Sequence, residues 1–597
     1  MSISDRLLPL PIGAIRFTGP IDRCIRLVCE RHLKVLDQRS LVDWFRDRRN
    51  PFASGEFWGK TMRSACPLMR YLDDAGLRER MRISVDDLLS TQDADGCIST
   101  RTPDQQPLSS DLWERKYVLL GLLAWHEASG EPRALDAMVR LADHVLALVG
   151  PSPKRRITDT GWAFAGIESS SILEPMLRLH RLTGHRRLLE FARYIVEEEG
   201  ACGRGSIFAA ALAGVPPKDI GGNGDPAQSI AKAYESLSCF EGLLEYHRLT
   251  GEPRWLQAAS AYWRAVRERE ITVIGSGGGE GPHNRGPGTG EQWNDLAADQ
   301  ADPAPRLMME TCVTVTWMKF SLNLLRLTGD PAIADEIERS LHNALLGALR
   351  PSGDNWDYFQ PLHGRRGNTV NFASDIAGFP LSCCTANGPM GLAMLLDAAV
   401  MSDAAGPVIN LFIPGTMTVP LADGHSVRLD ITTAYPVDGR IAITVTPSRP
   451  GRFTIAVRIP AWSAATHLEA DGQVVGTSPG TFARIERIWS PGERIVLDLD
   501  MRCRRLSAPR GAFDAVVRGP LVLARDHRLG GDIDAPVAIT ADPAGCVIAS
   551  AQNASVAAQV HCRIPTNDGG SIPLIDYASA GATWDERSRL RVWLPRG

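Results

Sequence analysis

The chain has 597 residues, and its 65 Lys and Arg residues against 69 Asp and Glu residues give a formal net charge of −4. This balance excludes the strongly basic surface expected of a protein that binds nucleic acid or an anionic membrane. A hydrophobic fraction of 44% is typical of a folded globular protein, and a chain of this length is expected to form at least two domains.

The N-terminal segment "MSISDRLLPLPIGAIRF" carries an early Arg and two prolines and has no uninterrupted apolar run, so it does not resemble a secretory signal. No stretch is long and apolar enough for a membrane span. Without an export signal, the twelve cysteines are expected to be reduced thiols. We therefore predict a cytoplasmic protein without membrane contact, in which residues 1–25 form an extension that pairs with a β region.

A recurring helix ending dominates the next part of the chain. "ASGEP" and three copies of "RLTG" followed by His, Glu or Asp each close a run with apolar residues at three-and-four spacing. Glycine accepts the left-handed conformation that ends a helix, and the Pro or acidic residue that follows suits the start of another. The four glycines are Gly130, Gly184, Gly251 and Gly329. Each is expected to join two helices of a hairpin.

The spacing of these hairpins predicts a helical domain over residues 26–402. Five or six helix hairpins in a closed ring form an (α/α) toroid, whose loops at one rim surround a central pocket. An open solenoid of the same hairpins is the alternative.

The composition changes near Asp403, where segments such as "SVRLDITTAYP" and "RIVLDLDM" alternate apolar and polar residues between Gly, Pro and Asp. Val427, Leu429 and Ile431 are expected to share one buried face. We predict a β-sandwich over residues 403–525 and an additional β-rich region over residues 526–597. The fold class is therefore multidomain, α followed by β.

Three thiols and a carboxylate lie in two short runs, "METCVTVTWMKF" and "LSCCTANGPM". The four residues are Glu310, Cys312, Cys383 and Cys384. Glu310 and Cys312 share a face only if the backbone there is extended, and adjacent Cys383 and Cys384 need a tight turn to reach one ion. Thiolate ligands with one carboxylate favour Zn²⁺ over hard cations. A catalytic zinc site, a structural zinc site and a redox-active vicinal pair all remain open from spacing alone.

These runs, together with "GTGEQW" and "DYFQPLHG" and in the order in which they occur, resemble the motifs of glycoside hydrolase family 127, the β-L-arabinofuranosidase family. Further matches in "GEFWGKTMRSA", "STQDADGCIST", "RIPAWS" and "RGPLVL" extend the resemblance from about Phe57 to Leu523. It implies a retaining exo-glycosidase that acts on a short oligosaccharide, with an (α/α)6 barrel, β-sandwich domains and Zn²⁺.

The resemblance also implies roles for individual residues. Cys383 is the expected nucleophile and, with Glu310, Cys312 and Cys384, a zinc ligand, and Glu291 is the expected acid/base. The other candidates for substrate contact are Tyr358, Trp58, Lys60, Trp293, Arg115 and Lys232. Glu280, after the glycine run "GSGGG", is an alternative acid.

The chain departs from the family where members active on β-L-arabinofuranosides hold the sugar with histidines. At the corresponding places it has Arg115 and Lys116, Ser171, and Lys232. Basic groups there favour an acidic or differently hydroxylated sugar. The remaining alternatives are a zinc-stabilised glycosidase with a carboxylate pair, a sugar isomerase or epimerase, and a carbohydrate-binding protein. The sequence leaves a homodimer open.

Overall fold

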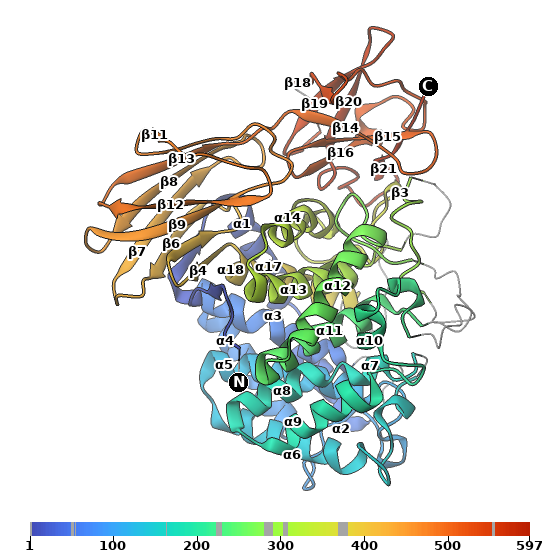
Figure 1. The fold of residues 1–597 in the computed structure, drawn as a ribbon. Coiled ribbons are helices and arrows are strands. Elements are labelled where there is room, and N and C mark those ends of the chain that lie inside the picture. The colour runs from blue at the N-terminus through green and yellow to red at the C-terminus, as the bar shows by residue number, and fades with distance from the viewer. Residues whose placement is uncertain are drawn as a thin grey trace.

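The computed structural model describes residues 3–48, 53, 55–162, 164–221, 230–279, 290–301, 308–367, 380–551 and 556–597 (Figure 1). In this part of the chain a helical domain is followed by three β-sheets, which is the coarse architecture expected from the sequence. None of the described helices combines the length and apolar composition that crossing a bilayer requires.

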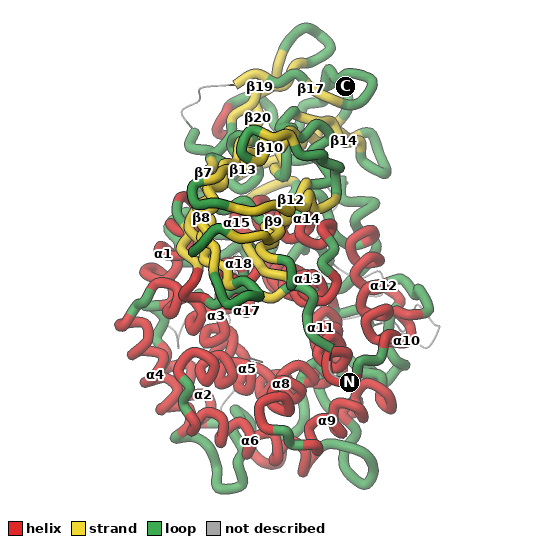
Figure 2. The backbone as a smooth tube through the Cα atoms, turned by 60° about the vertical axis from the view of Figure 1, so that its left-hand side comes forward, coloured by secondary structure: helices red, strands yellow, loops and turns green. Residues whose placement is uncertain are grey.

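The inner layer of the helical domain is a set of helices whose contacts close into a ring. In the described chain these are α3 (Glu56–Leu72), α5 (Asp111–Ser129), α8 (Leu173–Thr183), α11 (Ala233–Thr250), α13 (Thr311–Thr328) and α17 (Cys383–Ala393). Each packs on the next, and α17 returns to α3. Figure 2 shows them arranged around a common centre, which we call the ring axis.

A second layer of helices packs outside the ring. The outer helices, each packed mainly on one inner helix, are α4 (Ala75–Leu89), α6 (Pro132–Leu148), α9 (Arg186–Arg193), α12 (Pro253–Arg269), α14 (Pro331–Ser340) and α1 (Gly19–Val28). Shorter elements are α2 (Gln38–Asp47), α7 (Ile167–Ser170), α10 (Ile207–Leu212), α15 (Leu346–Ala348) and α18 (Leu395–Ala398). Gly130, Gly184, Gly251 and Gly329 each end an inner helix with φ between 66° and 72°, which confirms the predicted helix ends.

The burial pattern separates the two layers. Every residue of α11 from Ala233 to Arg248 is buried, including glutamates, because one side of the helix packs on the outer layer and the other faces the ring axis. In α12 the buried residues are Trp255, Ala258, Ala259, Tyr262, Trp263 and Val266, which form the single apolar stripe typical of a surface helix. Polar residues buried on inner helices are therefore the side chains that can build a site on the axis.

Two sheets form a sandwich after the helical domain. One has the order β1-β4-β5-β9-β12 and the other β11-β10-β13-β8-β7-β6-β2. Their strands are β1 (Leu8–Pro9), β2 (Ile15–Phe17), β4 (Val400–Asp403), β5 (Gly406–Ile409), β6 (Gly415–Pro420), β7 (Ser426–Thr433), β8 (Arg440–Pro447), β9 (Gly451–Ile459), β10 (His467–Ala470), β11 (Gln473–Val474), β12 (Thr481–Trp489) and β13 (Glu493–Asp498). Val427, Leu429 and Ile431 of β7 are buried, as the alternation predicted. The N-terminal strands β1 and β2 pair with β4 and β6, respectively.

The third sheet contains the C-terminal strands. They are β14 (Cys503–Ser507), β15 (Phe513–Arg518), β16 (Leu521–Asp526), β17 (Cys546–Val547), β18 (Ser550–Ala551), β19 (His561–Pro565), β20 (Ser571–Asp576), β21 (Arg589–Arg591) and β22 (Leu594–Pro595). The predicted boundary at residue 525 is wrong, because β14, β15 and β16 pair with this sheet and not with the sandwich. Alternation shows which face of a strand is buried, but it does not show which sheet the strand joins.

A buried arginine joins the sandwich to the helical domain. Arg458 of β9 is fully buried, and its guanidinium lies 2.5 Å from Glu338 of α14 and also pairs with Asp335 of the same helix. The third sheet is joined at another point, where β3 (His363–Arg365) pairs with β21. Because β3 follows Tyr358 along the chain, this pairing tethers a segment that carries a candidate site residue.

The closest helix packing within the ring is between α3 and α5. A Cβ atom at Gly59 of α3 would lie 1.9 Å from the backbone oxygen of Tyr117 of α5, so only glycine fits there. Tyr117 faces the ring axis beside the candidate site described below. The two helices can therefore approach this closely only because Gly59 has no side chain.

We expect Gly59→Ala to lower the free energy of unfolding by at least about 2 kcal/mol, because backbone must move to relieve the clash. Chemical denaturation would measure the change. Gly13→Ala is the control, since a Cβ at this exposed glycine meets nothing within 4 Å. Equal stability of the two variants would contradict the close α3–α5 contact.

Candidate active site

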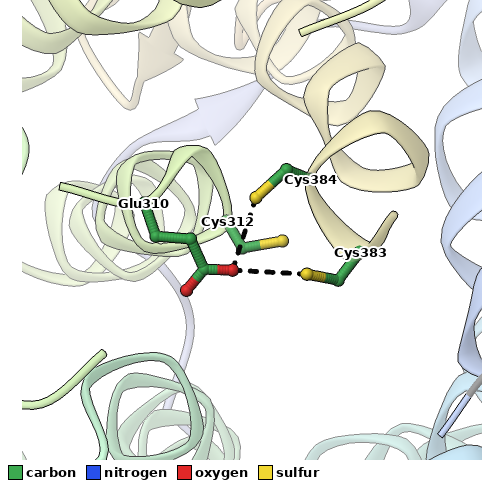
Figure 3. Close-up of side chains that lie close together, drawn as sticks. All are labelled: Glu310, Cys312, Cys383 and Cys384. Carbon is green, nitrogen blue, oxygen red and sulfur yellow. Dashed lines mark hydrogen bonds between the residues drawn. The ribbon is translucent and has the colours of Figure 1, made fainter. Parts of the chain in front are cut away.

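Four ligand-type side chains meet at one end of the ring axis. One ligand atom from each of Glu310, Cys312, Cys383 and Cys384 lies within 4.8 Å of all the others. Glu310 Oε1 is 3.4 Å from the sulfurs of both Cys383 and Cys384, and Figure 3 shows the four side chains pointing toward one another. Cys383 is half-buried and the other three are buried. We call these residues the thiol cluster.

The start of α17 places two of the thiols. Ser382 caps this helix by accepting a hydrogen bond from the Thr385 backbone, and the Thr385 hydroxyl accepts one from the Ser382 backbone. Cys383 and Cys384 are therefore the first two helical residues. Side chains of adjacent helical residues diverge by about 100°, less than in a strand, so both can turn toward one carboxylate. The turn expected after the cysteines is the first turn of a helix.

The start of α13 places the other two ligands. Glu310 is the residue just before the helix and has an extended backbone, with φ −65° and ψ 138°, whereas Cys312 lies in the first turn. Residues 310–312 were expected to be extended or to lead into the helix, and the backbone is extended at Glu310, with the helix beginning at Thr311. The ends of α13 and α17 that carry the partial positive charge of a helix N-terminus both face the cluster, which favours anionic groups there.

The segment around Tyr358 lies across the start of α13. The Thr311 backbone donates to the carbonyl of Tyr358 at 3.1 Å, and the Gln360 backbone donates to that of Met309 at 3.3 Å. These bonds hold the Tyr358 hydroxyl between two other candidates. It donates to Glu291 Oε1 at 2.5 Å and lies 3.3 Å from the sulfur of Cys383.

The pKa values of the four cluster residues shift in different directions. Burial and the neighbouring Glu291 and Cys383 raise the pKa of Glu310 well above its usual range, and burial and nearby thiols raise the pKa values of Cys383 and Cys384. Burial alone would also raise the pKa of Cys312. Hydrogen bonds from the other two thiols and the Lys60 ammonium outweigh it and lower the pKa to about 7. The four acidic groups cannot all ionise without an added cation.

The donor set fits a bound zinc ion. Three sulfurs and one carboxylate oxygen match the number and type of ligands of a tetrahedral site, in which sulfurs bonded at about 2.3 Å stand about 3.8 Å apart. Glu310 Oε2 is buried and has no hydrogen-bond partner among the described residues. A dication would offset the repulsion that raises the pKa values of Glu310, Cys383 and Cys384.

Lys60 supplies the cation nearest to Cys312. Its ammonium is fully buried on α3, 3.7 Å from the sulfur of Cys312 and 3.1 Å from Glu56 Oε1. The same ammonium lies 5.1 Å from the ring centre of Tyr117 and 4.6 Å from that of Tyr234. Lys60, predicted as a substrate contact, thus lies next to the cluster, where its positive charge favours ionisation of the Cys312 thiol.

Glu291 and Lys232 meet on the other side of Tyr358. Glu291 has a φ of 61°, and its carboxylate forms a close ion pair with the Lys232 ammonium. Burial alone would raise the pKa of Glu291, but Lys232 and the Tyr358 hydroxyl hold it below its usual range. Glu280 lies outside the described residues.

Three predicted substrate residues do not reach the cluster. Trp58 is buried and donates its indole N–H to Ser84, and Trp293 is buried and donates to Tyr262 at 2.7 Å. Arg115 is fully buried and pairs with Asp111 at 2.9 Å and with His144 of the outer helix α6. Trp58 and Arg115 lie on the inner helices α3 and α5, whereas Trp293 lies in the segment between α12 and α13. All three side chains are buried in contacts with other parts of the helical domain.

The sequence reasoning also missed several residues around the site. Glu56, Tyr117 and Tyr234 surround Lys60, and Glu235 follows Lys232 by one helical turn. A signal for one of them was present, because Glu56 precedes Lys60 by four residues on a helix. Nothing in the periodicity distinguishes the two tyrosines from ordinary core aromatics.

A separate cavity of about 390 Å³ lies farther along the ring axis. It is lined by residues of all six inner helices of the described ring and holds no member of the thiol cluster. Its deeper charges are paired, Arg63 with Glu174 at 2.6 Å and Lys319 with Glu241 at 3.1 Å. This end of the axis therefore carries a structural ion-pair network.

Comparisons with known proteins agree with this fold. A model of the GH127 β-L-arabinofuranosidase catalytic domain matches residues 30–395, and the GH127 middle-domain model matches residues 407–501. The matched part spans both cluster-bearing helices and most of the chain. The chain is therefore a glycoside hydrolase. It belongs to family GH127, the β-L-arabinofuranosidase family, which confirms the resemblance seen in the sequence.

Individual relatives are distant in sequence and similar in fold. The non-reducing end β-L-arabinofuranosidase of Bifidobacterium longum subsp. longum is 23% identical over 551 residues, covering 82% of this chain and 80% of that protein. A GH127 β-L-arabinofuranosidase from Geobacillus stearothermophilus T6 matches with a TM-score of 0.79 and 18% identity, covering 98% of this chain and all of that one. A further GH127 β-arabinofuranosidase structure matches with a TM-score of 0.75 and 18% identity, covering 100% of this chain and 98% of that one.

In metal-free protein we expect one cluster thiol to ionise with an apparent pKa of about 7, as assigned to Cys312. Ultraviolet thiolate absorbance followed against pH would measure it. Cys312→Ser should abolish this transition, and Lys60→Met should move it to higher pH because the ammonium favours the thiolate. A transition unchanged in Lys60→Met would contradict the assigned role of Lys60.

Proposed function

We propose that the protein is a retaining exo-glycosidase that removes a β-L-arabinofuranosyl group from the end of a short oligosaccharide. Cys383 is the nucleophile and Glu291 the acid/base. The family of the chain and the arabinofuranosidase activity named for its relatives support the substrate. We interpret the closed helical ring as the (α/α)6 barrel that positions both groups.

The observation that carries the proposal is the position of the Tyr358 hydroxyl between Glu291 and Cys383. It is 2.5 Å from one carboxylate oxygen and 3.3 Å from the sulfur, so these two atoms are at most about 6 Å apart. Retaining glycosidases place acid/base and nucleophile about 5–5.5 Å apart, whereas inverting enzymes need about 6.5–9.5 Å to admit a water molecule. The geometry therefore favours direct attack on the sugar.

The proposed reaction has two steps. Cys383 Sγ donates an electron pair to C1 of the sugar while the C1–O bond breaks, and Glu291 transfers a proton to the leaving oxygen. This step uses the fraction of the enzyme in which Glu291 is protonated, because Lys232 and the Tyr358 hydroxyl favour the ionised carboxylate in the free enzyme. In the second step Glu291 takes a proton from water as the water oxygen attacks C1. The C1–S bond breaks and its electrons return to sulfur, so the configuration is retained.

Zinc held by Glu310, Cys312, Cys383 and Cys384 would supply a charge that keeps the Cys383 thiol ionised. Lys60 adds a second positive charge at the Cys312 side of the cluster. Tyr358 separates the thiol from the Glu291 carboxylate and contacts both. These residues thereby stabilise a sulfur anion beside a carboxylate.

Two alternatives receive less support. In a glycosidase with the carboxylate pair Glu291 and Glu310, Glu310 would need a free oxygen near the sugar, yet its Oε1 lies 3.4 Å from two thiols and both of its oxygens are buried. An acidic sugar was inferred from several basic residues. Arg115 is committed to Asp111 and His144, so the case for a carboxylated substrate now rests on Lys116 and Lys232. The Lys116 ammonium is buried against aromatic rings, 4.3 Å from the ring centre of Trp113 and 4.9 Å from that of Tyr117.

We expect Cys383→Ser to lower hydrolysis of an aryl β-L-arabinofuranoside by at least about 1,000-fold, because a neutral hydroxyl replaces the ionised sulfur. Cys66→Ala, at a buried cysteine of α3 outside the cluster, is the control and should stay active. Proton NMR of the first product should show the β anomer. Substantial activity of Cys383→Ser, or inversion at C1, would refute the proposed nucleophile.

We expect purified protein to contain about one zinc ion per chain, measured by mass spectrometry of the metal. Cys312→Ser and Glu310→Gln should each lose most of it, because each removes one of four ligands. Both variants should also unfold at a lower temperature, as a structural contribution of the metal requires. Full activity in zinc-free protein would contradict the proposed role of the metal.

A further inference from the structure

Lys232 is buried against the proposed acid/base and has few other partners in the described chain. It is the last residue before α11, is 7% exposed, and its ammonium pairs with Glu291 Oε2. The ammonium also lies 3.5 Å from the Gly290 carbonyl and 5.0 Å from the ring centre of Phe164. Three contacts of the ammonium thus converge on the segment that carries Glu291 and on one aromatic face.

The backbone around Glu291 is fixed to the same part of the chain. The Ala233 backbone donates to the Glu291 carbonyl at 3.0 Å, and the Trp293 backbone donates to the Ala231 carbonyl at 2.9 Å. Gln292 pairs with Lys232 in an isolated β-bridge. Lys232 and Glu291 are therefore parts of one rigid unit, in which the ammonium holds one carboxylate oxygen and the Tyr358 hydroxyl holds the other.

We propose that Lys232 is a positioning residue that acts through Glu291, and that it favours the ionised carboxylate needed to activate water in the second step. This inference rests on the proposed function. It replaces the earlier expectation that Lys232 binds the sugar. In the second step the proton moves from water to Glu291, and an ammonium already in place fixes the carboxylate for that transfer.

Other charged groups around the pair do not take over this role. Those that face it from neighbouring elements are Glu235 on α11, Glu168 on α7, Glu310 before α13, Lys60 on α3 and Tyr358. The carboxylates among them repel Glu291 and would disfavour its ionised form. Lys60 is engaged with Glu56 and Cys312. Among the described residues, Lys232 is the cation in direct contact with Glu291.

The test uses Lys232→Met and Lys232→Arg in the full-length protein, with Lys319→Met as the matched control. Lys319 is also a buried lysine on the ring axis paired with a glutamate, but its partner is Glu241. With a nitrophenyl glycoside the leaving group departs readily, so the water step limits kcat. We expect Lys232→Met to lower kcat about 10- to 100-fold and kcat/KM much less.

The pH profile separates this role from a structural one. Removing the ammonium raises the pKa of Glu291, so the acid limb of kcat, which requires the ionised carboxylate, should move to higher pH in Lys232→Met. Lys232→Arg should restore the limb and most of kcat, because it keeps the charge. In a Glu291→Gln background, Lys232→Met should have little further effect. Additive losses would show a direct sugar contact and overturn the inference.

A measurement without substrate keeps the inference separate from the proposed function. Infrared difference spectra of the wild-type protein and Lys232→Met, each compared with its Glu291→Gln derivative, should show the Glu291 carboxylic acid band appearing at higher pH without the lysine. If the carboxylic acid band appeared at the same pH in both proteins, the inference would be overturned even if hydrolysis is observed. A shifted band in a protein that hydrolyses no arabinofuranoside would reject the substrate assignment and retain the Lys232–Glu291 coupling.

Discussion

The site depends on the N-termini of two neighbouring helices of the ring. The first turn of a helix leaves N–H groups unsatisfied and carries partial positive charge, so anions are stabilised there. The chain places Glu310 and Cys312 at the start of α13 and two adjacent thiols at the start of α17. The packing of α13 on α17 brings these starts together, so helix packing assembles the cluster.

Charged side chains along the ring axis lie in layers. Within each layer they are paired, because burying an unpaired charge costs free energy. The thiol cluster and Lys60 occupy one layer, and the rings of Tyr117 and Tyr234 lie beside Lys60. Farther along, Arg63 and Lys319 are paired with glutamates around the polar cavity. The thiol cluster differs because its four members are all acids, and this imbalance is the physical reason to expect a cation there.

Local chemistry in the sequence predicted the helix ends and the identity of the cluster. A Gly in the left-handed conformation and a group of thiols near one carboxylate are each visible in a few adjacent residues. The direction in which a side chain points across a two-layer ring is not local, so the sequence did not show that Trp58, Trp293 and Arg115 bond to Ser84, Tyr262 and Asp111. The start of α17 was also readable, because Ser382 and Thr385 have capping-box spacing, but the cysteines were interpreted as a turn.

The two proposed catalytic groups lie a short distance apart, and each is favoured as an anion by a positively charged neighbour. These neighbours come from different elements of the structure. A thiol at Cys383 ionises more readily beside positive charge, which the α17 terminus provides and a cation held by the cluster would increase. Glu291 receives its positive neighbour from Lys232, on the segment before α11. The Tyr358 hydroxyl stands between the two, donating to the carboxylate while touching the sulfur. Because the ammonium beside Glu291 and the ion that would be held beside Cys383 belong to different parts of the site, the proposed change in the protonation of Glu291 would leave the Cys383 thiolate ionised.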